Sequence, residues 1–127
     1  MIQNKANFKD SLLVACRSKH LVVADILIKN KANIESLDND KGTILFNLCK
    51  EGNIEAVKLL IQNKSNIEAP NNTGCTPLHI SCQERHLDIV TLLIQNKSNL
   101  TTPDNIGVTP LDILYQKRYT EIINSLI

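Results

Sequence analysis

The sequence is poor in aromatic residues and in glycine. Two Tyr, two Phe and no Trp make up 3% of its 127 residues, whereas apolar residues make up 43%. A large globular core generally relies on bulky aromatic side chains, so we expect a thin stack of elements filled with Leu, Ile and Val. The four glycines match neither a P-loop nor a dinucleotide-binding motif, and we find no enzyme signature.

An excess of one charge and a long apolar run are missing as well. The net charge is +1, with no run of five or more like charges, which argues against binding to nucleic acid and against a basic membrane-surface helix. No stretch approaches the ~20 apolar residues of a membrane-spanning helix. Because Met1–Lys5 does not resemble a signal peptide, we expect a single intracellular, cytoplasmic domain without membrane insertion.

A repeat of 33 residues runs through the chain. The segments Leu59–Asn66 and Leu92–Asn99 are identical and lie 33 positions apart, and Ile26–Asn33 is a similar segment one period earlier. Self-similarity at this period is typical of stacked arrays, because a single unit cannot bury its apolar face alone. Below, positions that are 33 residues apart are said to occupy the same slot.

Each unit contains two short helical patterns, which are clearest in the third unit. Thr76 is a suitable N-cap, and Pro77 fits the first helical position. Buried residues at Leu78, Ser81 and Cys82 have helical spacing. A turn near Arg85–His86 precedes a second helix over residues 87–95, whose apolar stripe is predicted at Leu87 or Ile89, and at Val90, Leu93 and Ile94. A loop rich in turn-forming residues follows.

Two antiparallel helices and a protruding turn every 33 residues resemble the ankyrin repeat. The segment Asn71–Cys82 closely resembles the signature of that family, Asp104–Leu114 resembles it too, and Asp38–Cys49 is a poorer match. The resemblance implies an all-α solenoid of stacked helix-turn-helix units with protruding turns, here called fingers. We predict one domain over residues 1–127, with an incomplete first unit that lacks a finger (8–37), two complete units (38–70 and 71–103) and a shortened last unit (104–127).

The chain departs from the family pattern at three kinds of position. Lys31, Lys64 and Lys97 stand where the family usually has a glycine after the second helix, so we expect local backbone strain or a cap shifted by one residue. Residues 2–7 resemble the tail of a preceding unit. The apolar residues at the far end, Ile122, Ile123, Leu126 and Ile127, do not resemble a polar terminal cap, so self-association through apolar ends is possible.

Cysteine and histidine residues invite a thiol or metal site. Cys16 and His20, like Cys82 and His86, are four residues apart, but Asn53 replaces the histidine in the second unit. We therefore expect Cys16, Cys49 and Cys82 to be small buried residues, too far apart to form disulfides. Cys75 lies in a finger and is expected to be exposed and the most reactive thiol. The resemblance implies that the ring of His79 holds its turn by hydrogen bonds.

The resemblance also implies a concave partner-binding surface, formed by the finger tips and the exposed side of the first helices. We predict that a groove ~40 Å long, from four units at ~10 Å each, binds a protein or peptide without a cofactor. Alternative readings are a structural spacer or targeting segment of a larger protein, and an enzyme with a thiol or metal site. The predicted contact residues are Asn39, Asp40, Lys50, Glu51, Asn72, Thr73, Gln83, Glu84, Asn105, Ile106, Gln116 and Lys117.

Five of these form the contact patch on which we expect binding to depend most. The family pattern adds a third position in each finger, at Gly42, Cys75 and Val108, and two further positions at Arg17 and Ser18 in the first unit. Charge is mixed at the centre of the row, and its end at Ile106 and Val108 is more apolar, as is typical of an interface rim. The patch consists of Lys50, Glu51, Gln83, Glu84 and Ile106.

Overall fold

The computed structural model describes residues 5–127, with side chains from residue 11 onward. This part of the chain consists of helices and connecting loops, together with an isolated antiparallel bridge between Leu37 and Thr43. The helices are α1 (Lys5–Arg17), α2 (Leu21–Lys29), α3 (Ile44–Glu51), α4 (Ile54–Gln62), α5 (Pro77–Gln83), α6 (Leu87–Gln95), α7 (Pro110–Gln116) and α8 (Thr120–Leu126).

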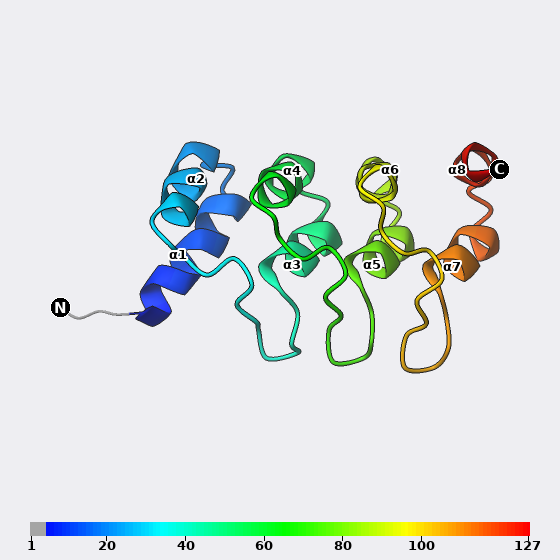
Figure 1. The fold of residues 1–127 in the computed structure, drawn as a ribbon, viewed down its shortest axis with the longest axis horizontal. Helices are drawn as coiled ribbons and strands as arrows, with labels where there is room; N and C mark the ends of the chain where they lie inside the picture. The colour runs from blue at the N-terminus through cyan, green and yellow to red at the C-terminus, as the bar shows by residue number, and fades with distance from the viewer. Residues whose placement is uncertain (1–4) are drawn as a thin grey trace.

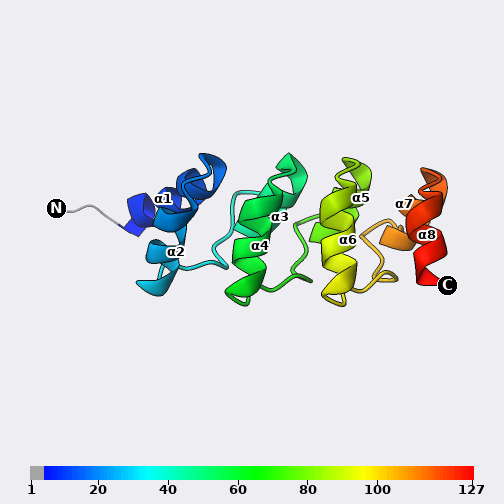
Figure 2. The ribbon, with the colours of Figure 1, turned by 90° about the horizontal axis from the view of Figure 1, so that it is seen from above.

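The helices lie in two layers, which confirms the predicted all-α solenoid. The first helices of the units, α1, α3, α5 and α7, form one row, and the second helices, α2, α4, α6 and α8, form the other (Figure 1). Seen from above, the units follow one another along a single axis (Figure 2). Each first helix packs on its own second helix and on the next first helix. The three loops between units project on the side of the first helices.

Threonine side chains fix the start of three first helices, as predicted. The Oγ1 atoms of Thr43, Thr76 and Thr109 each accept a hydrogen bond from the backbone amide three residues later, at 3.0, 3.3 and 3.0 Å. Pro77 and Pro110 occupy the first helical position of α5 and α7, where no amide donor is needed.

The second helices end with a lysine in the left-handed region. Lys31, Lys64 and Lys97 have φ angles of 74°, 71° and 72°, so the lysine itself takes the position that the family usually gives to glycine. The amide three residues past the end of each of these helices returns to the carbonyl five residues earlier, at 3.0 Å, as Ala32 does to Leu27; this is a Schellman motif. The expected strain is present, and the alternative of a shifted cap is wrong.

The interior consists of the aliphatic and small residues that the repeat pattern predicts. Leu78, Ser81 and Cys82 are fully buried, and so are Ile89, Val90 and Leu93 of α6. Of the two alternatives for the stripe of α6, Ile89 is correct and Leu87 is wrong, because Leu87 lies at the helix start with 40% of its surface exposed. Ile94 is half-buried against the core.

The first unit begins with a helix longer than the others. α1 has 13 residues, whereas α3, α5 and α7 have eight or seven. The interpretation of residues 2–7 as the tail of a preceding unit is wrong for residues 5–7, which are helical; residues 2–4 lie outside the described part. A helical extension therefore stands in the slots where later units have a finger.

Candidate partner-binding surface

Each finger is held rigid by one side chain at its base. The Oδ1 atom of Asp38 accepts from the amides of Asp40 and Gly42, at 2.8 and 2.9 Å. Asn71 and Asp104 do the same in the second and third fingers, at 2.9–3.0 Å. The backbone amide of each base residue also donates to the carbonyl four residues later, at 2.8 or 2.9 Å. Such side-chain turns let Asp and Asn replace backbone partners.

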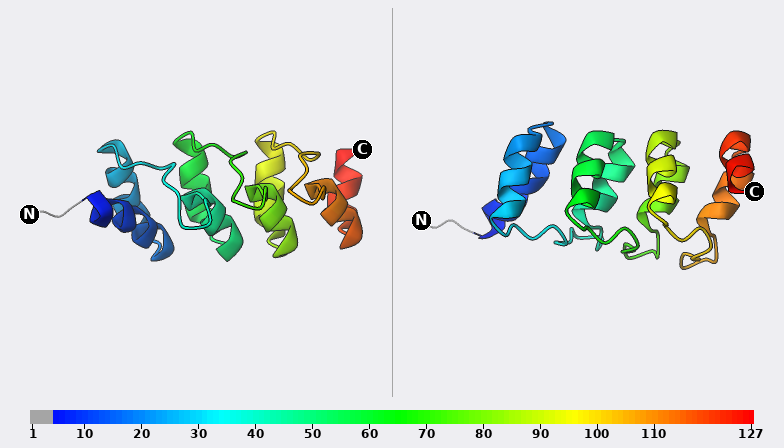
Figure 3. Two further views of the ribbon diagram at one scale, coloured as in Figure 1. Left: turned by 90° about the horizontal axis from the view of Figure 1, so that it is seen from below. Right: turned by 45° about the horizontal axis from the view of Figure 1, so that its top comes forward.

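Neighbouring fingers are joined by hydrogen bonds between predicted contact residues. The amide of Asn72 donates to the carbonyl of Asp40 at 2.8 Å, and the amide of Asn105 donates to the carbonyl of Thr73 at 3.0 Å. The side-chain amide of Asn105 also donates to the carbonyl of Asn72, at 3.1 Å. The three fingers therefore form one hydrogen-bonded row, which Figure 3 shows from below.

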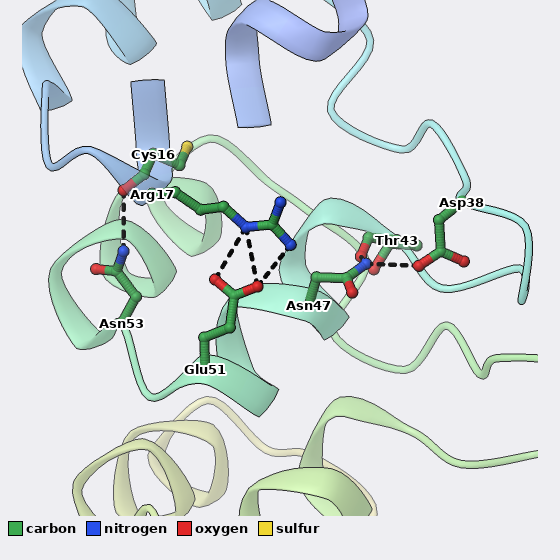
Figure 4. Close-up of polar contacts among 7 residues, drawn as sticks. All are labelled: Cys16, Arg17, Asp38, Thr43, Asn47, Glu51 and Asn53. Carbon is green, nitrogen blue, oxygen red and sulfur yellow. Dashed lines mark hydrogen bonds and ion pairs between the residues drawn. The ribbon is translucent and has the colours of Figure 1, made fainter. Parts of the chain in front are cut away.

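The predicted helix residues lie in the last turn of α3, α5 and α7 or directly after it. Lys50, Glu51, Gln83 and Glu84 are exposed. Glu51 is paired with Arg17 of the preceding unit: the Arg17 Nη2 atom is 2.6 Å and its Nε atom 2.9 Å from Glu51 Oε2 (Figure 4). The hydrogen bonds that Arg17 donates to the Glu51 carboxylate raise the pKa of Arg17. This exposed pair contributes little to stability, but it orients both side chains.

A second slot joins each unit to the one before it. The side chains of Asn53, His86 and Tyr119 bond the carbonyls of Cys16, Lys50 and Cys82, at 2.9, 3.0 and 3.3 Å. These carbonyls lie in the last turn of a first helix, where intrahelical partners are lacking. The ring of His86 fills the space beside Gly52, where an added Cβ would lie 2.6 Å from the ring. The end of α3, which carries Lys50 and Glu51, is therefore held in place by His86 of the next unit.

His79 holds its own turn, as the resemblance implied, and also contacts the next finger. Its Nδ1 atom accepts from the amide of Thr76 at 3.0 Å, so its Nε2 atom carries the proton and donates to the carbonyl of Val108 at 2.8 Å. The ring is 1% exposed. His79 therefore has a structural role, and it positions the third finger against α5.

The tail of each complete unit is fastened by a carboxylate from the unit before. Glu35 Oε2 accepts from the amide of Asn66 at 2.8 Å, and Glu68 Oε2 accepts from the amide of Asn99 at 2.9 Å. In the last member of this slot, Thr101 replaces the glutamate. The bonds bridge units, which keeps the spacing between fingers fixed.

Most of the predicted contact residues lie at the surface of the structure. Eleven of the twelve are exposed, and Lys117 is half-buried. We call this set of twelve the display surface. The third finger position does not belong to it, because Gly42 is buried and Cys75 and Val108 are half-buried.

A hollow beside the first finger includes residues that the sequence did not indicate. It has a volume of about 260 Å³. Asn47 of α3 lies at its wall and donates to Asp38 Oδ2 at 2.9 Å (Figure 4). The signal was present in the repeat, since Asn47 stands in a slot that otherwise holds Val14, Ile80 and Ile113. The hollow is lined by Leu13, Ser36, Leu37, Asp38, Asn39, Gly42, Ile44 and Asn47.

The cysteines lie mostly in the interior. Cys16, Cys49 and Cys82 are fully buried, which confirms their predicted packing role, and all four cysteines are free thiols. Cys75 is half-buried rather than exposed, and burial together with the charge of Asp104 raises its pKa to about 11. The prediction that Cys75 is exposed is therefore wrong, although it is the least buried of the four cysteines. In the described part of the chain, no three His, Cys, Asp or Glu residues are grouped so that they could hold a metal ion.

A family model decides the classification. The model for ankyrin repeats (3 copies) matches residues 12–104 and 69–127. The chain belongs to the ankyrin-repeat family. Ankyrin repeats are generally protein–protein interaction modules, and the family is typically non-catalytic. A comparison with curated proteins finds no match to this ankyrin chain. None of the helices within residues 5–127 is long and apolar enough to span a membrane.

Proposed function

We propose that this ankyrin domain is a protein–protein interaction module that binds a protein or peptide through the display surface. The observation that supports the proposal best is the exposure of eleven of the twelve side chains along one row of fingers and helix ends. Residues on loops that a rigid scaffold positions are common in binding sites.

The rigidity of the row favours binding. The finger backbones are fixed by Asp38, Asn71 and Asp104 and are joined to one another by inter-finger hydrogen bonds. A preorganised surface loses little conformational entropy when a partner binds. The side chains at the tips can therefore contribute most of their contact energy to affinity.

The chemistry of the contact patch suggests a partner with both polar and apolar groups. Side by side, the patch has a positive charge at Lys50, negative charges at Glu51 and Glu84, and an uncharged amide at Gln83. Ile106 is 85% exposed at the tip of the third finger, and such an apolar side chain beside polar ones fits an interface. A protein surface or an extended peptide offers these groups over the length of several units.

The experiment compares partner capture by three versions of the domain in lysate of the source organism. The wild-type chain is compared with a variant in which the five residues of the contact patch are alanine. A control variant changes a matched set on the second helices, with an exposed ion pair, a further acid, a glutamine and an exposed leucine: Glu55, Lys58, Gln62, Leu87 and Asp88 to alanine.

We expect the patch variant to lose a captured protein that the wild type and the control variant both retain. The affinity for that protein, measured by calorimetry, should fall at least tenfold in the patch variant alone, because a few interface residues usually carry most of the binding energy. Circular dichroism should show all three versions folded. Capture that is unchanged in the patch variant, or lost in both variants, would contradict the proposal and would leave the spacer role.

A further inference from the structure

Two slots at the ends of the first helices lie opposite each other across each boundary between units. At the first boundary Arg17 and Glu51 occupy them, and the guanidinium bonds both carboxylate oxygens at 2.6–3.1 Å (Figure 4). At the second boundary Lys50 and Glu84 stand in the same two slots. The repeat therefore places a second basic and acidic pair where the first one forms an ion pair.

The second pair is open. In the part of the chain whose side chains are described, neither the ammonium of Lys50 nor the carboxylate of Glu84 takes part in an ion pair or a hydrogen bond, and both residues are exposed. An arginine fork binds a carboxylate through two parallel bonds, which a lysine ammonium cannot do. Burial raises the pKa of Cys75, and the charge of Lys50 partly offsets this effect, so the ammonium lies beside the second finger.

The neighbouring charges leave this pair unneutralised. Arg85 directly follows Glu84 but forms no ion pair within residues 11–127. Its charge lies near Tyr119 of the next unit, because burial raises the pKa of Tyr119 and Arg85 lowers it. At the third boundary the two slots hold Gln83 and Lys117, which cannot form an ion pair. The second boundary therefore presents two unpaired, opposite charges within the display surface.

The backbone beneath both side chains is fixed. The ring of His86 bonds the carbonyl of Lys50 at 3.0 Å, and the amide of Glu84 donates to the carbonyl of Ile80 at 2.9 Å. A partner that binds at this boundary therefore has to order only the two side chains. This keeps the entropic cost of binding small.

We infer that Lys50 and Glu84 select a partner segment that carries one acidic and one basic side chain on the same face of an extended chain. The inference rests on the proposed function, because it gives these two residues of the display surface the role of choosing the partner.

The spacing of the two charges fits such a segment. Helices in neighbouring units pack ~10 Å apart, and the two long side chains can bring their charges closer than that. Side chains two residues apart in an extended segment point to one face and lie ~7 Å from each other. The acidic side chain pairs with Lys50 and the basic one with Glu84, and a like charge at either place weakens binding.

Nuclear magnetic resonance titration of the isotope-labelled domain with three peptides tests this choice. The peptides are end-capped, share one threonine-rich sequence and differ only at two positions, which are two residues apart. One peptide has a glutamate and an arginine there, one has two glutamates and one has two arginines. The wild type should bind the mixed peptide about threefold more tightly than either like-charged peptide, as expected for exposed ion pairs.

Charge reversal should switch this preference. Glu84→Lys makes both positions basic, so this variant should prefer the peptide with two glutamates. Lys50→Glu makes both positions acidic, so this variant should prefer the peptide with two arginines. The control variants Lys58→Glu and Glu55→Lys make the same changes of charge on exposed residues of α4 and should keep the preference of the wild type.

The outcomes separate this inference from the proposed function. A wild type without a preference for the mixed peptide, a charge reversal that fails to switch the preference, or a control variant that switches it would each overturn the inference. If the variant with five alanines loses the captured protein while the peptides give no such pattern, the proposed function stands without this inference.

Discussion

At the residue scale, the side chain in a given slot differs with the group in the neighbouring unit that it can contact. His79 donates to the finger of the following unit, whereas Asp112 caps its own helix, accepting from Thr109 at 3.0 Å. The slot of Asn53, His86 and Tyr119 admits three residue types because each can donate to a helix-terminal carbonyl. These positions therefore require a hydrogen-bond donor placed near the carbonyl, and not one particular residue type.

The thiol of Cys75 should react slowly at neutral pH. Its pKa is raised from 9.0 to about 11, so the thiol stays protonated below pH 11 and the nucleophilic thiolate is scarce. At pH 8 the thiolate population should be roughly 100-fold below that of a cysteine with the ordinary value, since each pKa unit is tenfold. The rate of reaction with an aromatic disulfide reagent should rise about tenfold per pH unit between pH 7.5 and 9.5.

A Cys75→Ser variant identifies which thiol reacts. The slow phase should disappear in this variant, because Cys16, Cys49 and Cys82 are fully buried. In denaturant all of the thiols should react at once. A reaction of the native wild type at pH 8 as fast as that of free cysteine would contradict the raised pKa.

At the element scale, helix starts and ends explain how much of the fold could be predicted. The bounds of α6, Leu87–Gln95, match the prediction because the apolar period and a turn at each end fix them. The extension of α1 was not predicted, because residues 2–7 resemble a unit tail, although residues 5–10 contain neither proline nor glycine and nothing in them excludes a helix. The choice between Leu87 and Ile89 was left open because an apolar residue in a first turn can point either way.

The residues of the display surface could be chosen from the family pattern. The hydrogen bonds between units that hold this surface could not be predicted. Glu35 and Asn66 are 31 residues apart, and only the stacking of units brings them together. The side-chain amide of Asn105 is engaged by Asn72 of the neighbouring finger, which no local pattern indicates. The half-burial of Cys75 likewise depends on the next unit, because Asp104 of the third finger is close enough to raise its pKa.

Replacing Lys97 with glycine should stabilise the domain. Lys97 has a φ of 72° and an exposed side chain. A left-handed conformation costs an L-residue ~1–2 kcal/mol, and glycine removes that cost but loses ~0.5–1 kcal/mol in conformational entropy. We therefore expect the free energy of unfolding to rise by ~0.5–1 kcal/mol, measured from the midpoint of urea denaturation.

A glycine two residues earlier is the matched control. Gln95→Gly lies within α6 and should lower the free energy of unfolding by ~1 kcal/mol, since glycine is a poor helix former. If Lys97→Gly destabilised the domain as much as Gln95→Gly does, the lysine side chain would have to stabilise the folded state by a contact that outweighs its backbone strain.

At the scale of the whole molecule, stability should vary along the array. In a solenoid each unit contacts only its neighbours, so end units can open separately. Helix α8 has no buried residue, whereas Ile44–Phe46, Leu48 and Cys49 are buried in α3 alone. Hydrogen exchange should therefore be faster in α8 than in the other second helices α4 and α6. It should be slowest in the central helices α3 to α6.

Replacing His79 with alanine should uncouple the last unit from the rest. The change removes the 2.8 Å bond to Val108, whose carbonyl keeps the bond from the amide of Asp104. It also leaves the buried amide of Thr76 without its Nδ1 acceptor, at a cost of ~1–3 kcal/mol. Because the bond to Val108 joins α5 to the third finger, protection against exchange should fall mainly in α7 and α8 and much less in α3 and α4. His20→Ala is the control, since His20 is exposed and makes no cap hydrogen bond at the start of α2. An equal fall in protection along the whole chain would show instead that the units unfold together, and that the surface they display is one cooperative body.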